Sequence, residues 1–318
     1  MTGPQSPPLV TIRITTYNQE KFAEEAVLSA VEQDYENLLV VVTDDHSQDG
    51  TPEILKRLAK TYPERIDLIL NDQNLGRTLN QDLALKASKG EFLAFLDGDD
   101  VLLPGKIAKQ VEFMQRNPSL VISYHDVEVF DWNTGQTLYY WSERFGAKGG
   151  NVNSIVRYGN FIPSAGVMLR RAAIPAKGYD DRIQIGADWI LFIETLHQSK
   201  GRFGYLDEVL SRYRRHQDNV TSDWDAKLID HLEVINVLKT GYPDLRRDAK
   251  KRLSDIYVME AVREFGIGSW FASIRSFTKA LTLALPNIFQ VFRLPIREIW
   301  FILKSGKLDP LTKTMFQK

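Results

Sequence analysis

Short apolar runs alternate with segments of helical spacing through the first 125 residues of the chain. The apolar runs are rich in β-branched and aromatic residues, as buried strands are, and they cover Leu9–Thr15, Leu38–Thr43, Ile66–Leu70, Phe92–Leu96 and Val121–Tyr124. Between them, apolar residues recur at intervals of three and four near Glu20–Gln33, Thr51–Tyr62, Thr78–Ser88 and Lys106–Asn117. This alternation predicts βαβ crossovers, and so an α/β fold with a mostly parallel sheet covered by helices.

The pattern changes after Val127. Glycine and aromatic residues are frequent at first, helical spacing then returns at Trp189–His197, and Tyr205–Tyr213 reads as a strand or turn. From Trp224 onward the sequence predicts helices separated by glycine and proline positions. We therefore expect one domain over residues 1–224, with halves at about 8–125 and 126–224, and a helical C-terminal extension over residues 225–318.

Composition limits the possible partners and locations. The formal net charge of -1 offers no global attraction to nucleic acid, so we expect no nucleic-acid partner. The lack of cysteine excludes disulfides, thiolate metal sites and cysteine nucleophiles, and is compatible with a reducing compartment. Met1–Pro8 lacks the features of a secretory signal, and no stretch reaches about 18 uninterrupted apolar residues. The expected location is therefore the cytoplasm, without a transmembrane helix.

Polar or acidic side chains follow four successive predicted strands. Ligands of open α/β sheets bind outside the carboxyl ends of the strands, so this edge is the predicted ligand site. In chain order the groups are Thr15-Thr16-Tyr17-Asn18, Asp44-Asp45-His46-Ser47, Asn71 to Gly76, and Asp97-Gly98-Asp99-Asp100.

The last of these groups is an acidic cluster. Asp97, Asp99 and Asp100 repel one another unless a cation or hydrogen-bond donors neutralise them. Their oxygens suit Mg²⁺ or Mn²⁺, and Gly98 allows a tight turn between them. Taken alone, the cluster is equally typical of a solvated turn that caps the helix beginning near Pro104.

The segment from Asp44 to Thr51 superficially resembles a calcium-binding loop. Counting from Asp45, however, Lys56 stands where the bidentate Glu should be, so that interpretation fails. Two alternatives remain. The segment is a polar turn in which Asp49 or Thr51 caps the next helix, or its first acidic pair accepts hydrogen bonds from a base or ribose.

Five ordered segments together resemble the family 2 glycosyltransferases, which have the Rossmann-like GT-A fold. They are Thr15–Asn18, Val42–Thr51, Asn74–Gly76, Lys89–Phe92 and Phe95–Asp100, and the resemblance covers roughly residues 8–225. It implies a metal-dependent, inverting hexosyl- or N-acetylhexosaminyl-transferase. Such an enzyme moves a sugar from a nucleoside diphosphate sugar, with UDP as the expected nucleotide, to a hydroxyl of a glycan or lipid-linked acceptor in cell-surface polysaccharide or glycoconjugate synthesis.

The resemblance also implies roles for individual residues. Those implied to bind the nucleotide-sugar are Thr15, Thr16, Tyr17, Asn18, Asp44, Asp45, Asn74, Gly76, Asn80, Asp97, Gly98, Ser164 and Trp189. Asp97 and Asp99 form the D-x-D motif, with Asp99 as the more direct ligand of Mn²⁺ or Mg²⁺. The sequence departs from the family at Thr15, Thr43 and His46, and His46 puts the identity of the base in doubt.

Motifs in the second half complete the implied site. Ile162–Arg171 resembles the family segment beneath the donor sugar, and Ile185–Leu191 resembles G-E-D-W-x-L, in which Asp188 is the catalytic base and Ala187 replaces the usual Glu. Tyr213–Ser222 resembles Y-R-x-H-x-x-N-x-S, in which His216 completes the metal shell or meets the diphosphate. Without that context, Asp188 is typical of a helix cap and His216 of a solvated loop.

The end of the chain carries a local positive charge. Residues 287–318 include six Lys or Arg and two Asp or Glu, interspersed with aromatic and aliphatic residues. A basic amphipathic helix of this kind can lie on an anionic membrane, which would make the protein peripheral on its cytoplasmic face. The alternative is packing on the catalytic domain or on a partner subunit, and the oligomeric state is not determined by the sequence.

Other functions fit the sequence less well. A nucleotidyltransferase would need a basic, glycine-rich loop after the first strand, and a NAD-dependent enzyme would need G-x-G-x-x-G there; neither is present. A catalytically degenerate nucleotide-sugar-binding protein remains an alternative, although Asp97, Asp99, Asp188 and His216 are all retained.

Overall fold

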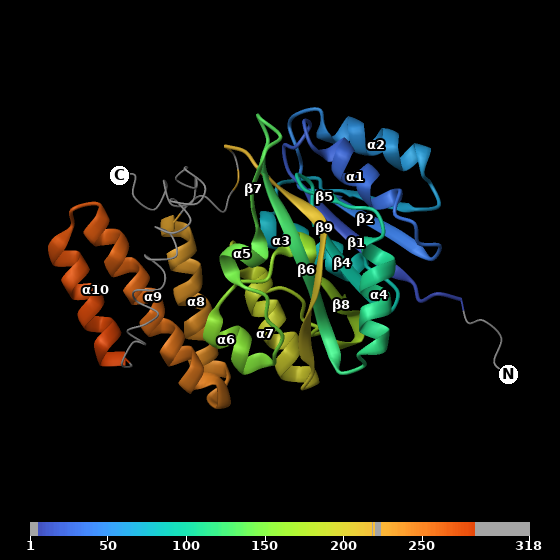
Figure 1. Ribbon diagram of the computed structural model, residues 1–318. Coiled ribbons are helices and arrows are strands. Elements are labelled where there is room, and N and C mark those ends of the chain that lie inside the picture. The colour runs from blue at the N-terminus through green and yellow to red at the C-terminus, as the bar shows by residue number, and fades with distance from the viewer. Residues whose placement is uncertain (1–5, 218, 220–223, 284–318) are drawn as a thin grey trace. The chain divides into compact units, whose positions relative to one another are not determined.

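The computed structural model describes residues 6–217, 219 and 224–283 (Figure 1). The chain divides into two compact units, of which the first comprises Met1–Val152 and Phe161–His216 and the second Asn153–Asn160 and Gln217–Lys318. The segment 287–318, for which we predict membrane contact, lies outside the described residues.

Strands and helices alternate in the first part of the first unit, as the sequence predicts. The strands β1, β2, β3 and β4 lie side by side in the order β3-β2-β1-β4, and every pair among them is parallel. Their bounds, with the intervening helices, are β1 Val10–Thr16, α1 Ala23–Val31, β2 Leu38–Asp44, α2 Thr51–Thr61, β3 Ile66–Leu70, α3 Arg77–Ala87 and β4 Phe92–Asp97.

The remaining strands make the sheet mixed. Strand β8 is antiparallel to both β4 and β6, β6 is parallel to β9, and β5 and β7 add antiparallel pairs with β9 and β6. The α/β fold is thus confirmed, with its parallel part concentrated in β1 to β4. The other elements of this unit are β5 Val101–Leu102, α4 Lys106–Arg116, β6 Leu120–Asp131, β7 Thr137–Tyr140, α5 Trp141–Phe145, β8 Met168–Arg170, α7 Ala187–Ser199 and β9 Arg202–Arg215.

Strand β6 is longer than its apolar run predicts. The run is interrupted by His125 and Asp126, but both are buried, and the strand continues to Asp131. Asp126 accepts hydrogen bonds from the Val127 amide at 2.9 Å and the Ser142 amide at 2.8 Å. Polar residues interrupt a hydrophobic pattern without ending the strand when tertiary partners satisfy them.

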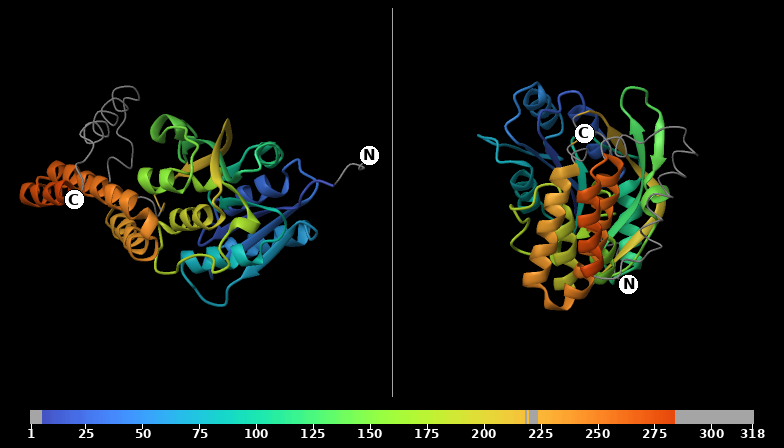
Figure 2. Two further views of the ribbon diagram at one scale, coloured as in Figure 1. Left: turned by 90° about the horizontal axis from the view of Figure 1, so that it is seen from below. Right: turned by 90° about the vertical axis from the view of Figure 1, so that its left-hand side faces the viewer.

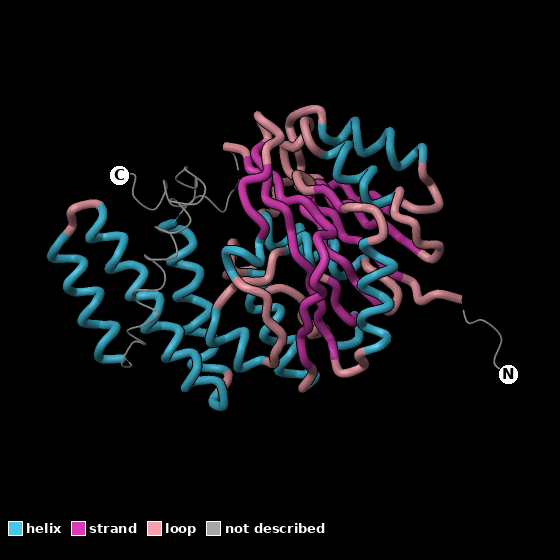
Figure 3. The backbone as a smooth tube through the Cα atoms, in the orientation of Figure 1, coloured by secondary structure: helices cyan, strands magenta, loops and turns pink. Residues whose placement is uncertain are grey.

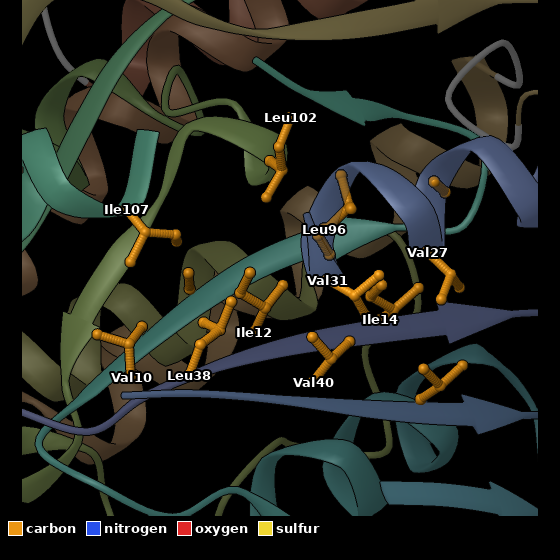
Figure 4. Close-up of a cluster of buried hydrophobic side chains, with 14 of the residues drawn as sticks. Val10, Ile12, Ile14, Val27, Val31, Leu38, Val40, Leu96, Leu102 and Ile107 are labelled. Carbon is orange, nitrogen blue, oxygen red and sulfur yellow. The ribbon is translucent and has the colours of Figure 1, made fainter. Parts of the chain in front are cut away.

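The two faces of β1 pack against different surroundings. Val10, Ile12 and Ile14 alternate along the strand and pack in one cluster with side chains that include Val27 and Val31 of α1 (Figure 4). The same cluster includes residues of α2 and α4, so these three helices cover one face of the sheet. Thr11 and Arg13 point to the opposite face, because successive strand side chains alternate in direction.

Helices α3 and α7 cover that opposite face of the sheet. Helix α3 packs on β1 and β2, and Phe192 of α7 lies with its ring centre 6.0 Å from that of Phe95 on β4. Figure 3 shows the strands of this unit as a continuous layer with helices on both sides. A parallel sheet is normally covered on both faces in this way, since its strands are apolar on both.

The second unit is helical. It contains most of α6 Val152–Tyr158, together with α8 Trp224–Gly241, α9 Arg246–Gly266 and α10 Trp270–Leu283. Helices α8, α9 and α10 run side by side (Figure 2). Arg157 of α6 pairs with Asp255, and Trp224 donates to Glu260 at 2.7 Å. The predicted C-terminal helices are confirmed within the described residues, and none of those helices is long and apolar enough to cross a membrane.

A lysine lies in the interior of the first unit. Lys106, at the start of α4, is 0% exposed, and its Nζ donates to the Val167 carbonyl at 3.2 Å. Burial lowers the pKa of Lys106 from 10.5 to about 7. Between those values the unfolded chain binds one more proton than the folded chain, so folding stability rises with pH across this window.

We predict that Lys106→Met removes this rise. From pH 7 to pH 9.5 the free energy of unfolding of the wild type should gain roughly 2–4 kcal/mol relative to the variant. Urea denaturation at three pH values measures the difference. Lys60→Met, which replaces an exposed lysine near the end of α2, is the control and should keep the wild-type slope. Parallel slopes for wild type and Lys106→Met would contradict the prediction.

Candidate active site

The carboxyl ends of β1, β2 and β4 meet at one edge of the sheet. In the parallel register Thr16 lies opposite Asp44, and Thr15 lies opposite Asp97. The structure therefore brings together three of the four residue groups that the sequence placed at strand ends. The fourth, after β3, joins them through side-chain hydrogen bonds described below.

Asp44 organises the turns after β1 and β2. Its carboxylate is 1% exposed and accepts hydrogen bonds from Thr16 Oγ1 at 2.9 Å, Ser47 Oγ at 2.6 Å and the Ser47 amide at 2.9 Å. Asn18 has a positive φ of 50°, and its side chain accepts from the Gln48 amide at 2.8 Å. Internal donors occupy both Asp44 oxygens, so the structure supports a role for Asp44 in shaping the turns.

Asp45 binds the loop after β3 to the edge of the sheet where β1, β2 and β4 end. Its carboxylate accepts from Asn71 Nδ2 at 3.1 Å, the Leu75 amide at 2.8 Å and the Gly76 amide at 2.9 Å. Asn80 is also buried, and its Nδ2 lies 3.4 Å from both the Thr16 and Thr43 carbonyls. The Asn74 carboxamide likewise accepts from the Gly76 amide, at 3.1 Å. These contacts hold the loops of three strands in one arrangement.

Gly98 permits close contact between the acidic cluster and the turn after β1. Its amide donates to the Thr15 carbonyl at 3.0 Å. A Cβ at this position would lie 2.3 Å from Gln19 Oε1 and 2.5 Å from Thr16 Cγ2. The glycine is therefore required by close packing of two strand-end turns, which refines the sequence argument that it permits a tight turn.

The acidic cluster is largely shielded from solvent: Asp100 is 1% exposed, and the side chains of Asp97 and Asp99 are 17% and 15% exposed. Burial raises the pKa of Asp97, and Asp99 and Asp188 add to that effect while Arg77 and Arg13 oppose it. Burial also holds the pKa of Asp100 well above its usual range, with Asp99 and Asp97 contributing. Asp97 Oδ1 and Asp100 Oδ2 are buried and make no hydrogen bond with the described residues. Such oxygens suit a cation or the donors of a ligand.

Asp99 lies beside His216, as the two motifs together imply. The distance from His216 Nε2 to Asp99 Oδ2 is 3.0 Å. Arg214 fixes the end of β9, directly before His216: its amide donates to Asp100 Oδ1 at 2.9 Å and its Nε to the Asp99 carbonyl at 2.7 Å. The Arg214 guanidinium also lies over the rings of Phe22, Phe130 and Trp132.

The donor atoms at this point fit a divalent cation that is held jointly with a ligand. Within the described residues no three His, Asp or Glu side chains form a complete metal site. Asp99 and His216 supply one carboxylate and one imidazole, and the unsatisfied Asp97 oxygen lies in the same cluster. Mg²⁺ commonly binds through one or two carboxylates together with substrate phosphates, so this partial set is chemically adequate.

Arg13 connects the acidic cluster to Asp188, a contact that our sequence analysis missed. Its fully buried guanidinium lies 3.3 Å from Asp188 Oδ1 and 3.9 Å from Asp97 Oδ1, and stacks 3.7 Å from the centre of the Phe95 ring. Burial alone would lower the pKa of Arg13, but its electrostatic and hydrogen-bond interactions with Tyr179, Asp188 and Asp97 outweigh that effect and raise the pKa. The sequence contained an indication that Arg13 is unusual: apolar and polar residues alternate over Val10–Thr16, and Arg13 stands on the polar side of a buried strand.

Tyr179 was also missed, and it completes the contacts of Asp188. Its hydroxyl donates to Asp188 Oδ1 at 2.6 Å and receives a hydrogen bond from Arg13 at 2.9 Å. Asp188 lies in the first turn of α7.

Arg77, at the start of α3, is a second cation of the cluster, and its Nη2 lies 3.5 Å from Asp97 Oδ2. No local motif marks Tyr179 or Arg77.

The remaining predicted donor-site residues differ in accessibility. Tyr17 is 48% exposed at the end of β1, whereas Trp189 is 0% exposed and among the largest fully buried side chains. Ser164 lies in the 3-10 helix Ser164–Gly166, and its Oγ makes no hydrogen bond with the described residues. The binding roles of these three residues stay predictions, and that of Trp189 has no exposed surface to support it.

The chain belongs to glycosyl transferase family 2, whose family model matches residues 11–174. Among curated relatives, an uncharacterized protein of Mycobacterium tuberculosis is 31% identical over 219 residues, covering 68% of this chain and 60% of that protein. The chain thus spans about 60% of the length of that relative. The putative teichuronic acid biosynthesis glycosyltransferase TuaG of Bacillus subtilis is 36% identical over 107 residues, covering 34% of this chain and 42% of TuaG.

Solved structures confirm the GT-A-type fold. TarS 1-349 of Staphylococcus aureus in complex with UDP-GlcNAc aligns with a TM-score of 0.65 at 15% identity, covering 96% of this chain and 90% of that one. The mannosyltransferase PcManGT of Pyrobaculum calidifontis, in complex with GDP-Man and Mn²⁺, aligns with a TM-score of 0.61 at 16% identity, covering 97% and 85%. At these identities the likeness concerns the fold alone.

We predict that Asp45→Asn destabilises the loop after β3. The new amide would present an N–H group to at least one of the three donors that Asp45 now satisfies, leaving a buried group unpaired at a cost of about 1–3 kcal/mol. Urea denaturation would show the loss. Asp72→Asn changes an exposed carboxylate in the same loop and should be neutral within about 0.5 kcal/mol. Equal stabilities of the two variants would show that the Asp45 contacts do not stabilise the fold.

Proposed function

We propose that this protein is a metal-dependent, inverting glycosyltransferase that uses a nucleoside diphosphate sugar. The expected donor is a UDP-sugar carrying a hexose or N-acetylhexosamine. The proposed acceptor is a hydroxyl of a glycan or lipid-linked molecule in cell-surface polysaccharide or glycoconjugate synthesis. One observation carries the proposal: Arg13 lies between Asp97 of the acidic cluster and Asp188, so the predicted donor side and the predicted base belong to one connected site.

Asp188 is suited to act as the base because its two oxygens have different surroundings. Tyr179 and Arg13 both contact Oδ1, which leaves Oδ2 for the acceptor. Oδ2 would take the proton of the acceptor hydroxyl while the hydroxyl oxygen forms a bond to the anomeric carbon. The bond between that carbon and the diphosphate oxygen breaks on the opposite face, and the nucleoside diphosphate departs with the electron pair. This single displacement inverts the anomeric configuration.

The acidic cluster and the strand-end turns are suited to the other end of the donor. Asp99 and His216, with Asp97 beside them, would hold Mn²⁺ or Mg²⁺, and the bound cation would neutralise the negative charge that develops on the diphosphate. Tyr17 offers an exposed ring near the end of β1 for contact with the base. Asp44 and Asp45 would act on the nucleotide mainly through the turns that they shape.

The descriptions of three similar proteins support the choice of donor, acceptor and cation. TarS, which shares the fold, is described in complex with UDP-GlcNAc, and this supports a UDP-sugar as the first donor to test. TuaG is named for teichuronic acid biosynthesis, which supports a cell-surface polysaccharide acceptor. PcManGT is described in complex with GDP-Man and Mn²⁺, which supports Mn²⁺ as the cation to test and GDP-sugars as the second class of donor.

We predict that Asp188→Asn retains donor binding and loses transfer. The amide cannot accept the proton, so kcat should fall by about 10²–10⁴-fold while the donor Kd stays within about twofold. Radiolabelled sugar transfer and calorimetric titration measure the two quantities. Asp181→Asn, an exposed neighbour in the preceding loop, serves as the matched control and should keep both. Transfer at the wild-type rate by Asp188→Asn would refute the assignment of the base.

We predict that Asp99→Ala removes the metal dependence of donor binding. Loss of one metal ligand should weaken donor binding in the presence of Mn²⁺ by about 10–100-fold or more. Calorimetric titration of the donor with and without Mn²⁺ compares the variant with Asp34→Ala, which removes an exposed carboxylate. A variant that still binds the donor more tightly with Mn²⁺, to the same extent as the wild type, would exclude Asp99 as a ligand.

A further inference from the structure

Helix α10 in the second unit carries a stripe of exposed apolar side chains. Trp270, Ile274, Phe277 and Leu281 follow one another at intervals of three and four, so they share one side of the helix. They are 61%, 65%, 41% and 44% exposed, and the neighbouring Phe271 is 92% exposed. Scattered single apolar residues are ordinary on a protein surface, whereas a contiguous stripe indicates a contact surface.

The side of α10 that packs on α9 is made of small residues. Ser276 and Ala280 are buried, Ser273 Oγ donates to the Ala261 carbonyl at 2.8 Å, and Ser254 Oγ donates to the Ala280 carbonyl at 2.9 Å. An amphipathic helix usually turns its large apolar residues toward the protein. Helix α10 does the reverse, so its large side chains contribute little to the folding of the second unit and are available to another apolar partner.

Charge indicates what that partner is. Helix α10 carries Arg275 and Lys279 and no Asp or Glu. From Trp270 to Lys318 the sequence holds eight Lys or Arg and two Asp or Glu, a formal net charge of +6 in a chain whose total is -1. Along the sequence, positive charge is thus concentrated from Trp270 to the end of the chain. Aromatic residues beside basic ones are typical of helices that lie in an anionic membrane surface.

We infer that the exposed face of α10, defined by Trp270, Phe271, Ile274, Phe277 and Leu281, binds an anionic lipid bilayer with the helix lying in the plane of the interface. Arg275 and Lys279 follow Phe271 at intervals of four, so they flank the apolar face, and a second copy of α10, which carries no Asp or Glu, would offer them no opposite charge. Residues 287–318 of the same chain carry a net charge of +4, so they too offer no net negative charge. Anionic headgroups instead neutralise both sets of charges, while the acyl boundary receives the apolar side chains. The inference does not depend on the proposed catalytic function.

The experiment measures sedimentation of the full chain with lipid vesicles. Vesicles of phosphatidylcholine and phosphatidylglycerol in equal parts are compared with vesicles of phosphatidylcholine alone. The wild type should bind the anionic vesicles and do so less at high salt. The combined variant Trp270→Gln, Phe271→Gln and Ile274→Gln should reduce partitioning by at least about tenfold, since it removes three of the five apolar side chains.

Two further variants separate the contributions. Arg275→Gln with Lys279→Gln should weaken binding to the anionic vesicles by about tenfold or more and leave any binding to phosphatidylcholine unchanged. Ile229→Gln removes an isoleucine of α8 that is 67% exposed, and it should bind like the wild type. Circular dichroism and thermal denaturation check that each variant is folded, which is expected because every replaced side chain is exposed.

Two results would overturn the inference. One is a folded triple variant that partitions as the wild type does. The other is a wild type that does not bind anionic vesicles but forms a dimer that the triple variant abolishes, which analytical ultracentrifugation would detect. In the second case the stripe is a contact between copies of this chain.

Discussion

The guanidinium of Arg13 and the carboxylates of Asp97 and Asp188 form one buried group of charges. Arg13 is fully buried and lies 3.9 Å from Asp97 Oδ1 and 3.3 Å from Asp188 Oδ1. An isolated buried charge costs several kcal/mol, so neither the arginine nor the carboxylates would be stable here alone. Asp97 ends β4 and Asp188 begins α7, and a single side chain of β1 thus holds the two sides of the site together.

The turns around this group are held by hydrogen bonds that the protein makes with itself. Asp44, Asp45 and Asn80 are buried, and donors or acceptors from neighbouring turns satisfy them. A ligand would therefore meet loops whose positions are already set, and little ordering would be needed on binding. The unsatisfied oxygens of Asp97 and Asp100 contrast with this network. Carboxylates with and without internal donors thus lie at the same sheet edge, and the unsatisfied oxygens have capacity left for a cation or a ligand.

The helical unit follows a different packing rule from the sheet. In the first unit large aliphatic residues of β1, α1, α2 and α4 form the core, and Figure 4 shows those of β1, α1 and α4, among them Ile12, Val27 and Ile107. In α10 the buried residues are small and the large ones are exposed. The burial of large apolar groups drives folding in the first case and is available for association in the second. The large side chains of the first unit thus stabilise its fold, whereas those of α10 are left for the membrane contact that we infer.

Much of the architecture could be predicted from the sequence. The alternation of apolar and polar positions located β1 to β4 and α1 to α4, because the side-chain period of a strand or helix is a local property. The same reasoning placed Thr15–Asn18, Asp44, Asp45 and Asp97–Asp100 at one edge, since parallel strands end on the same side. It failed at His125 and Asp126, which are buried inside β6, where Ser142, 16 positions further along the chain, donates to Asp126.

Only the tertiary structure decided which of these residues contact one another. Arg13 and Asp188 are separated by 175 positions, and Asp99 and His216 by 117. The internal satisfaction of Asp44 and the complete burial of Trp189 likewise depend on how distant segments pack. Periodicity encodes the element and the face on which a residue lies. The partner it meets depends on strand order, register and side-chain packing, which no local pattern contains.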